Sequence, residues 1–311
     1  MAGRQGRWRG FFHELGKNRS AYLMALPGII LFIVFSYIPM AGLIMAFKDL
    51  DFSLGFLKSP WVGLKNFEFL LKSRDLLRIT RNTLVLNMLF IGPGLVFDVA
   101  VAILLNEIWN KYFKGISQSF LFLPYFLSWV VVDVIARGFL GSNAGMINHI
   151  LAKVGIPAVN WYGTPGIWPA LLFFFNRWKW TGYGSIIYLS AITSMNPELF
   201  ESAAIDGTNR WQRIRYITVP LLKPIIAVML LLQIGRIFFS DFAMIYGLIG
   251  DNGVLYRYTD TIDVYVFRAL RILGDMGMSA AAAFYQSAMG FIIIMLSNYW
   301  VRRVSPENAL F

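Results

Sequence analysis

The sequence predicts an all-α protein that crosses a lipid bilayer several times. Hydrophobic residues make up 57% of the 311 positions and charged residues only 14%, whereas soluble domains carry about 25% charged residues. Six apolar segments each reach the roughly 20 residues that a helix needs to span a membrane. The segments are continuous and lack the period-two alternation of membrane β-strands. We therefore expect a fold of six transmembrane helices.

The six predicted spans form one membrane domain, residues 21–303. In chain order they are Ala21–Phe47, Thr83–Leu105, Ile116–Leu140, Ile167–Ile192, Leu221–Ile249 and Ala280–Val301. Several contain proline, which membrane helices tolerate because neighbouring groups bind the carbonyls that proline leaves free. The first span is longer than the apolar core of a signal peptide, about 7–15 residues, so we expect it to be retained.

The charges between the spans predict the orientation of the chain. Loops on the cytoplasmic side of a membrane carry an excess of Lys and Arg. Residues 1–20 are basic, and Arg302 and Arg303 precede the tail 304–311, so we expect both termini to be cytoplasmic. The loop 48–81 disagrees, because it is also rich in Lys and Arg yet would lie outside. Its apolar residues recur at helical spacing, so we expect part of it to lie along the membrane surface.

The loop after span four, residues 196–220, predicts two short helices on the cytoplasmic side. Asn196 suits the N-cap of the first helix. Gly207 suits the left-handed backbone conformation that ends it. Thr208 or Asn209 can cap the second helix. We expect the two helices to meet at an angle near Gly207.

This loop resembles the EAA motif of type I ABC-importer permeases. The matching residues are Glu201, Ala203, Ala204, Asp206 and Gly207, followed by Ile217-Thr-Val-Pro220. The family usually has alanine where Ser202 stands. The resemblance covers roughly residues 20–303. The segments VGLKNF, NTL, NWYG and WKWTGYGSIIYL are similar to the carbohydrate-uptake branch of the family, and in particular to LplB-like sugar permeases.

The resemblance implies a fold, a mechanism and a set of partners. The fold is the six-helix type I importer domain, placed in the bacterial cytoplasmic (inner) membrane. The 196–220 loop would couple to a separate ATPase, with Trp211 and Pro220 extending the EAA residues. The implied partners are a second homologous permease, two ATPase subunits that bind ATP and Mg, and an extracytoplasmic solute-binding protein. The solute would be a carbohydrate, in particular an oligosaccharide, either neutral or acidic.

Several other classes of protein are disfavoured. The chain lacks the phosphate-binding pattern G-x-x-x-x-G-K-[ST] and the catalytic patterns H-E-x-x-H and G-x-S-x-G, so we expect neither an enzyme nor a cofactor on this chain. It has no Cys and two distant His, so we expect no metal site. Its net charge is +11, but the basic residues are distributed between the apolar segments and form no single basic stripe, which argues against nucleic-acid binding. A proton-coupled carrier using Asp133, Asp241 and Arg236 is the alternative function.

Ionisable and aromatic residues in the spans are candidates for the solute pathway. Charge at membrane depth is costly, so such residues usually face a cavity or a partner. Asp133 and Arg137 are one turn apart and can pair, and Asp133 or Asp241 could also neutralise the cations of span four. Asp98 is expected to be interfacial. The candidate pathway residues are Arg177, Trp178, Lys179, Trp180, Asp133, Arg137, Phe239 and Phe242.

Overall fold

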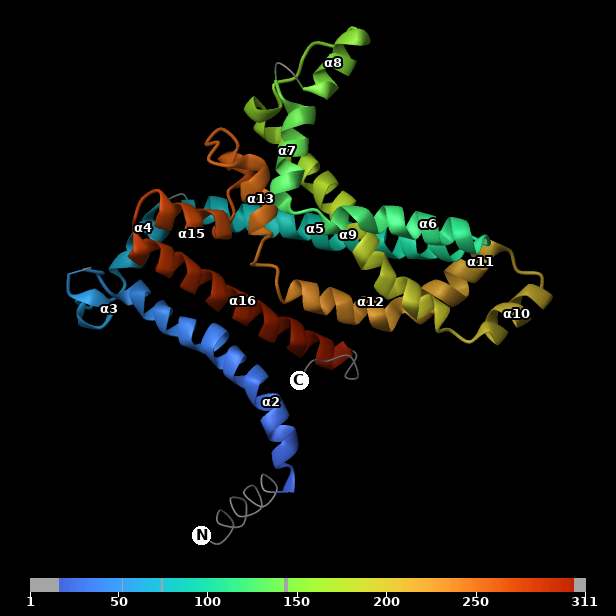
Figure 1. Cartoon of the computed structure of the whole chain (residues 1–311), viewed down its shortest axis with the longest axis horizontal. Helices are drawn as coiled ribbons and strands as arrows, with labels where there is room; N and C mark the ends of the chain where they lie inside the picture. The colour runs from blue at the N-terminus through green and yellow to red at the C-terminus, as the bar shows by residue number, and fades with distance from the viewer. Residues whose placement is uncertain (1–16, 52, 74, 143–144, 305–311) are drawn as a thin grey trace.

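The computed structural model describes residues 17–51, 53–73, 75–142 and 145–304. Throughout these ranges the regular structure is helical, apart from one isolated antiparallel bridge between Lys48 and Trp61. Long helices run beside one another through the body, and a separate N-terminal rod diverges from it (Figure 1). The prediction of an all-α membrane fold is confirmed.

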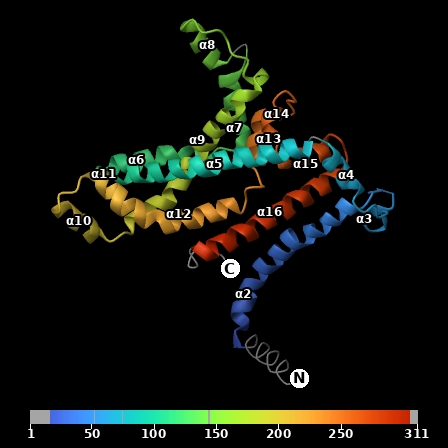
Figure 2. The same ribbon diagram turned by 180° about the vertical axis from the view of Figure 1, so that it is seen from behind.

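The first span is one rod made of three helical segments, α2 (Arg19–Phe32), η1 (Ile33–Tyr37) and η2 (Ile38–Phe47). It matches the predicted span Ala21–Phe47. No side chain of α2 or η1 is buried. In both views the rod meets the rest of the chain through η2, which lies next to α16 (Figures 1 and 2).

Two long helices form the centre of the molecule, α5 (Asp75–Asn106) and α9 (Trp168–Thr193). They contact each other more extensively than any other pair of helices in the described ranges. Small residues lie along this pair and its neighbours, among them Gly94, Gly182 and Gly184, each of which has an atom of another helix where a Cβ would be. Lipid is as apolar as a leucine side chain, so close packing of this kind, and not water exclusion, holds membrane helices together.

The predicted span Ile116–Leu140 is a bent pair of helices in the structure. Its first part comprises α6 (Lys111–Phe122) and η3 (Leu123–Phe126), and its second part, α7 (Trp129–Leu140), is bent away by 98°. Pro124 is the second residue of η3, and the two residues between the helices are extended. Proline cannot donate a backbone hydrogen bond, so it weakens the helix here.

The predicted span Leu221–Ile249 is wrong at both ends. A continuous rod begins earlier and contains α11 (Arg210–Arg213), η6 (Ile214–Thr218) and α12 (Val219–Ile234). The residues after it, up to Asp241, are not helical, and α13 (Phe242–Ile249) is a separate helix.

Side chains from other helices bind the backbone of the non-helical segment between α12 and α13. Asn87 Nδ2 donates to the Ile237 carbonyl (2.7 Å). Gln286 Nε2 donates to the Phe238 carbonyl (2.7 Å), and Asp263 accepts the Ser240 N–H (2.8 Å). Non-helical backbone is tolerated within a membrane only where its polar groups are bound in this way.

The remaining span, α16 (Met276–Val304), exceeds the predicted Ala280–Val301 at both ends. The other described elements are short: α3 (Gly55–Lys58), α4 (Lys65–Lys72), α8 (Met146–Lys153), η4 (Trp161–Gly163), η5 (Pro165–Ile167), α10 (Pro197–Ile205), α14 (Tyr256–Thr259) and α15 (Ile262–Arg271).

The basic loop 48–81 packs on the protein through α4. Phe67 makes ring contacts with Phe47 of η2 and Phe284 of α16. Asn66 Nδ2 donates to the Lys48 carbonyl (2.8 Å) and to two carbonyls at the end of η2. The face of α4 that carries Phe67 is therefore covered by protein and not by lipid.

The helices run between two ends of the molecule. One end gathers α10, α11 and the α5–α6 junction, and the other gathers α3, α4 and α15 (Figure 1). Within the described ranges four rods are long and apolar enough to span a membrane, and the bent α6–α7 pair makes five. The remaining long rod is α9, which is the fourth in chain order, has 26 residues and carries Arg177 and Lys179.

Candidate functional site

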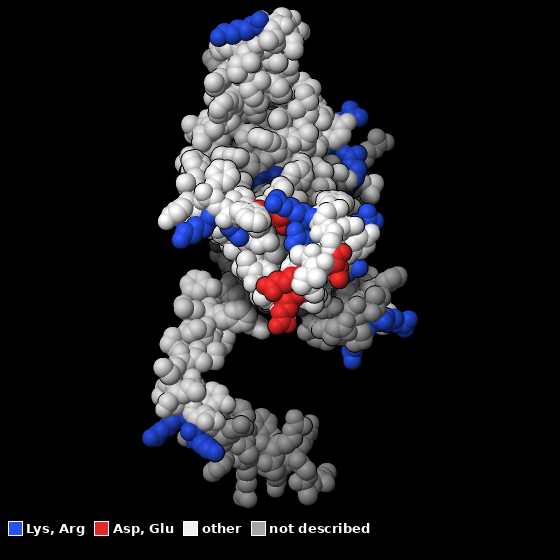
Figure 3. Space-filling view, turned by 90° about the vertical axis from the view of Figure 1, so that its right-hand side faces the viewer, with Lys and Arg blue, Asp and Glu red and all other residues white. Residues whose placement is uncertain are grey.

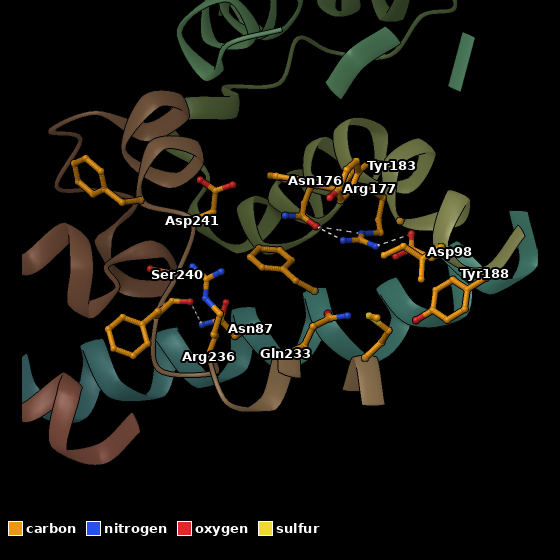
Figure 4. A pocket seen from close by; sticks show the side chains of 17 residues that line it. Asn87, Asp98, Asn176, Arg177, Tyr183, Tyr188, Gln233, Arg236, Ser240 and Asp241 are labelled. Carbon is orange, nitrogen blue, oxygen red and sulfur yellow. Dashed lines mark hydrogen bonds and ion pairs between the residues drawn. The ribbon is translucent and has the colours of Figure 1, made fainter. Parts of the chain in front are cut away.

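A cavity of about 550 Å³ opens between α5, α9 and the non-helical segment that follows α12. Figure 4 shows its charged and amide side chains pointing into a common space. The lining residues are Asn87, Phe90, Asp98, Asn176, Arg177, Trp180, Tyr183, Gly184, Ile187, Tyr188, Met229, Gln233, Arg236, Phe239, Ser240, Asp241 and Phe242. The cavity thus combines aromatic faces with hydrogen-bonding groups, as binding sites for polar solutes commonly do.

Arg177 is bound within the protein. Its Nη1 lies 3.3 Å from Asp98 Oδ1 of α5, and both side chains are more than four-fifths buried. Its remaining guanidinium nitrogens donate to Asn176 Oδ1. A Cβ at Gly94 would collide with the guanidinium, and a Cβ at Gly184 would collide with the Asp98 carboxylate. Asp98 is therefore buried and neutralises Arg177, and its position near the membrane interface stays a prediction.

Lys179 lies on α9 but does not line the cavity. It is 5% exposed, and its Nζ donates to the carbonyls of Pro124 (3.3 Å), Tyr125 (3.0 Å) and Leu127. These carbonyls belong to the bend between α6 and α7, where the Pro124 carbonyl also accepts the Leu127 N–H (3.2 Å). The ammonium group therefore holds the bend, and it is not free to meet a solute.

Three further pathway candidates lie elsewhere. Asp133 and Arg137 pair with each other on α7 (2.8 Å), and the Arg137 guanidinium also stacks over Tyr162. Trp178 faces an apolar hollow between α7, α8 and α9. The structure gives none of the three a place on the cavity, whereas Arg177, Trp180, Phe239 and Phe242 line it. That these four contact a solute stays a prediction.

The amide-bearing side chains of the cavity were missed by the sequence analysis. Asn87 and Asp98 are eleven residues apart on α5, a spacing close to three full helical turns, so they lie on one face. Asn176 lies beside Arg177 in the sequence. A search for polar residues that share a helix face could have found the first pair. Gln233, close to the end of α12, carries no such signal.

The carrier hypothesis requires Asp133, Asp241 and Arg236 to act together. Asp241 and Arg236 both line the cavity, but Asp133 is on α7 and paired with Arg137. Asp241 accepts hydrogen bonds from Trp129 Nε1 (3.0 Å) and from a backbone N–H at the start of α13 (3.1 Å). The three residues therefore form no continuous relay.

The 196–220 loop contains the two helices that the sequence predicts, α10 and α11. The Asn196 side chain caps α10 by accepting the Glu198 N–H (3.0 Å). Gly207 has φ +77°, a conformation that costs an L-residue about 1–2 kcal/mol. Asn209 and Gln212 form a reciprocal capping box at the start of α11. Because α11 continues into η6 and α12, it is the first turn of the fifth rod.

The α10–α11 surface is open. Glu201, Ala204, Asp206, Gly207 and Trp211 are exposed, and Ala203 and Pro220 are partly buried. Apolar side chains protrude from it, with Ile205 87% and Trp211 67% exposed. Figure 3 looks at this end of the molecule and shows acidic and basic side chains close together on it. Such a mixture of exposed apolar and charged groups is typical of a protein-binding surface.

Comparisons with known proteins agree with this architecture. Residues 94–306 match the family described as "Binding-protein-dependent transport system inner membrane component". The chain is 34% identical to the polygalacturonan/rhamnogalacturonan transport system permease protein YteP of Bacillus subtilis (strain 168), over 95% of this chain and 91% of that protein. It is 31% identical to Protein LplB of the same organism, over 97% of this chain and 95% of that protein.

Solved structures extend the likeness to the whole fold. A chain of a bacterial ABC transporter involved in the import of the acidic polysaccharide alginate superposes with a TM-score of 0.86 and 32% identity, covering 95% of this chain and 99% of that one. A second structure, of the alginate transporter with a pentasaccharide-bound periplasmic protein, gives a TM-score of 0.85. The family resemblance inferred from Glu201–Pro220 is confirmed: the chain belongs to the inner-membrane components of binding-protein-dependent ABC transport systems, in the branch whose curated members include sugar permeases.

Proposed function

We propose that this protein is the membrane-spanning permease subunit of an ATP-driven importer for an oligosaccharide, including acidic ones. The observation that carries the proposal is the exposed α10–α11 surface, with its turn at Gly207 and its protruding Ile205 and Trp211. The relatives include a permease for polygalacturonan and rhamnogalacturonan, and a similar solved structure belongs to an importer of the acidic polysaccharide alginate. A cavity with aromatic faces and amide groups also suits sugar rings and hydroxyls.

In this proposal the chain carries out no chemistry of its own. ATP and Mg are bound by two partner ATPase subunits, which dock on α10 and α11. A solute-binding protein outside the membrane delivers the oligosaccharide to the opposite end. Residues 1–20 and the tail 304–311 lie in the cytoplasm, although most of both segments falls outside the described residues. Basic residues at Lys17, Arg19, Arg302 and Arg303 support this orientation.

A second homologous permease completes the pathway. The first rod supports this proposal, because its described part leaves long apolar side chains such as Met24 (85% exposed) and Phe35 (73% exposed) uncovered. The described residues of this chain also leave the cavity partly open, as expected of half a pathway. A helix that stands apart from its own bundle, as in Figure 2, offers a neighbouring subunit a large packing surface.

Cross-linking tests the coupling surface directly. The chain has no Cys, so Ala204→Cys introduces a single reactive thiol on α10. Cross-linking of the assembled importer in membranes is expected to join this thiol to an ATPase subunit. The matched control is Leu57→Cys, which is 83% exposed on α3 at the other end and is expected to give no ATPase product. An importer in which Ala203→Cys and Ala204→Cys both fail to reach any ATPase would overturn the proposal.

A further inference from the structure

Arg236 differs from the other charged side chains that line the cavity. Asp98 is paired with Arg177, and both Asp241 oxygens accept hydrogen bonds, one of them from Trp129. The Arg236 guanidinium forms no hydrogen bond, ion pair or ring contact with any described residue. In the described lining, the cavity therefore offers a solute one free ionic group, and that group is a cation.

The backbone around Arg236 is held in place while its side chain is free. The residues that follow it, Ile237 and Phe238, are buried, and their carbonyls are bound by Asn87 of α5 and Gln286 of α16. Arg236 itself is exposed. In Figure 4 it lies with Ser240 and Asp241 toward one end of the cavity, and Asp98 lies toward the other. The bound backbone fixes the point from which the Arg236 side chain extends, and the guanidinium keeps its donors available for a ligand.

The surroundings of Arg236 suit a sugar acid. Trp180, Phe239 and Phe242 give the cavity ring faces, and Gln233 gives it an amide. A guanidinium binds a carboxylate through two parallel hydrogen bonds, which the hydroxyl groups of a neutral sugar cannot reproduce. An unpaired cation at membrane depth is costly unless a ligand or water compensates it. A carboxylate-bearing solute would supply that compensation.

We propose that Arg236 recognises a carboxylate of an acidic oligosaccharide and so determines the solute specificity of the importer. This inference rests on the proposed function. It also moves the anion-binding role away from Arg177 and Lys179, whose charged groups are already bound by Asp98 and by the carbonyls of the α6–α7 bend.

The test uses the complete importer, reconstituted in proteoliposomes with its second permease, ATPases and binding protein. The probes are tetragalacturonate and the same tetrasaccharide with its carboxylates methyl-esterified. Arg236→Gln is expected to raise the concentration needed for half-maximal uptake of the acid by about tenfold or more, because a charge-assisted pair is lost. Uptake of the ester is expected to fall much less than uptake of the acid, because the ester has no carboxylate to lose an ion pair.

Two matched variants sharpen the result. Arg236→Lys keeps the charge but loses the bidentate geometry, so it is expected to recover part of the acid uptake. Lys223→Gln removes an exposed cation from α12 that does not line the cavity, and it should change neither probe. If the binding protein delivers only the acid to the importer, the deciding measurement is whether Arg236→Lys recovers part of the acid uptake that Arg236→Gln loses.

Three results would overturn the inference. One is an equal loss with both probes, which would make Arg236 structural. Another is unchanged acid uptake in Arg236→Gln. The third is loss of the second permease from purified Arg236→Gln complexes, which would show that Arg236 pairs across the subunit interface. A wild-type importer that hydrolyses ATP but takes up neither probe would contradict the proposed oligosaccharide function itself.

Discussion

Asp98 and Arg177 meet in a space that two glycines leave open. Gly94 on α5 makes room for the guanidinium, and Gly184 on α9 makes room for the carboxylate. The pair joins the two central helices of the bundle across a distance of 3.3 Å. Breaking such a pair leaves one buried charge unpaired, which costs more than the pair contributes when intact.

Asp98→Asn is expected to destabilise the assembled importer by about 3–5 kcal/mol, because it leaves Arg177 buried without a counter-charge. The double variant Asp98→Asn with Arg177→Gln should recover most of this loss, since no buried charge then remains. Thermal inactivation of the purified complex measures both. Glu68→Gln on α4 is the control, because the Glu68–Lys72 pair is exposed and should contribute nothing measurable. A double variant as unstable as the single one would contradict this account.

The element that depends most on its neighbours is the bent α6–α7 pair. Lys179 of α9 binds the carbonyls at the bend, and Gly182 of the same helix lies directly against the Leu121 backbone of α6. The helix α9 therefore supplies both the ammonium group that binds the carbonyls of the bend and the glycine that lets α6 approach closely. A backbone obstacle cannot rotate away as a side chain can, so this contact tolerates no added atom.

Gly182→Ala is therefore expected to lower the stability of the complex by about 1–3 kcal/mol, since the new methyl group must displace α6. Gly115→Ala is the matched control, because a Cβ at Gly115 on α6 meets nothing within 4 Å. In a helix interior that change should be neutral or stabilising by up to about 1 kcal/mol. The yield and melting temperature of the two purified complexes decide the question. Similar values for both would show that the close approach is not needed.

At the scale of the whole molecule, the cavity and the exposed α10–α11 surface are separate. The cavity lies between the central helices, and α10 and α11 lie at one end of the bundle (Figure 1). Two rods join the cavity to the α10–α11 surface. One is α9, which runs from the cavity toward α10, and the other is the α11–η6–α12 rod, which runs from α10 back to the cavity. In the proposed importer, a movement of α10 would reach the cavity along these two rods.

Gly207→Val is expected to uncouple ATP hydrolysis from transport. A β-branched residue at φ +77° must change the turn between α10 and α11, although the space around Gly207 is open. Solute-stimulated ATP hydrolysis and uptake should fall, while insertion in the membrane stays normal. Gly207→Asn should be milder, because asparagine tolerates the left-handed conformation.

Gly155→Val is the control for backbone strain alone. Gly155 has φ +78° and follows α8, away from the coupling surface. Coupling should survive this substitution. If Gly155→Val impairs coupling as much as Gly207→Val does, the effect is general destabilisation and the coupling role of the turn is contradicted.

The sequence by itself determined the features that depend on neighbouring residues. The length of the apolar segments predicted the helical membrane fold. The capping residues and the glycine of the 196–220 loop predicted its two helices. The Asp133–Arg137 pair followed from helical spacing. Each depends on an interaction that closes within about one helical turn, or on a length of apolar chain, so a linear pattern contains the required information.

Only the tertiary structure decided where two spans break and which cavity charge is free. Asn87 binds the Ile237 carbonyl across 150 positions of sequence, and Lys179 binds carbonyls 52 to 55 positions away. Hydropathy cannot distinguish a continuous apolar helix from one whose broken backbone is bound by distant side chains. The same holds for Arg177 and Arg236, which look alike in the sequence. Asp98 neutralises Arg177 in a space that two glycines leave open, and no described residue forms an ion pair with Arg236.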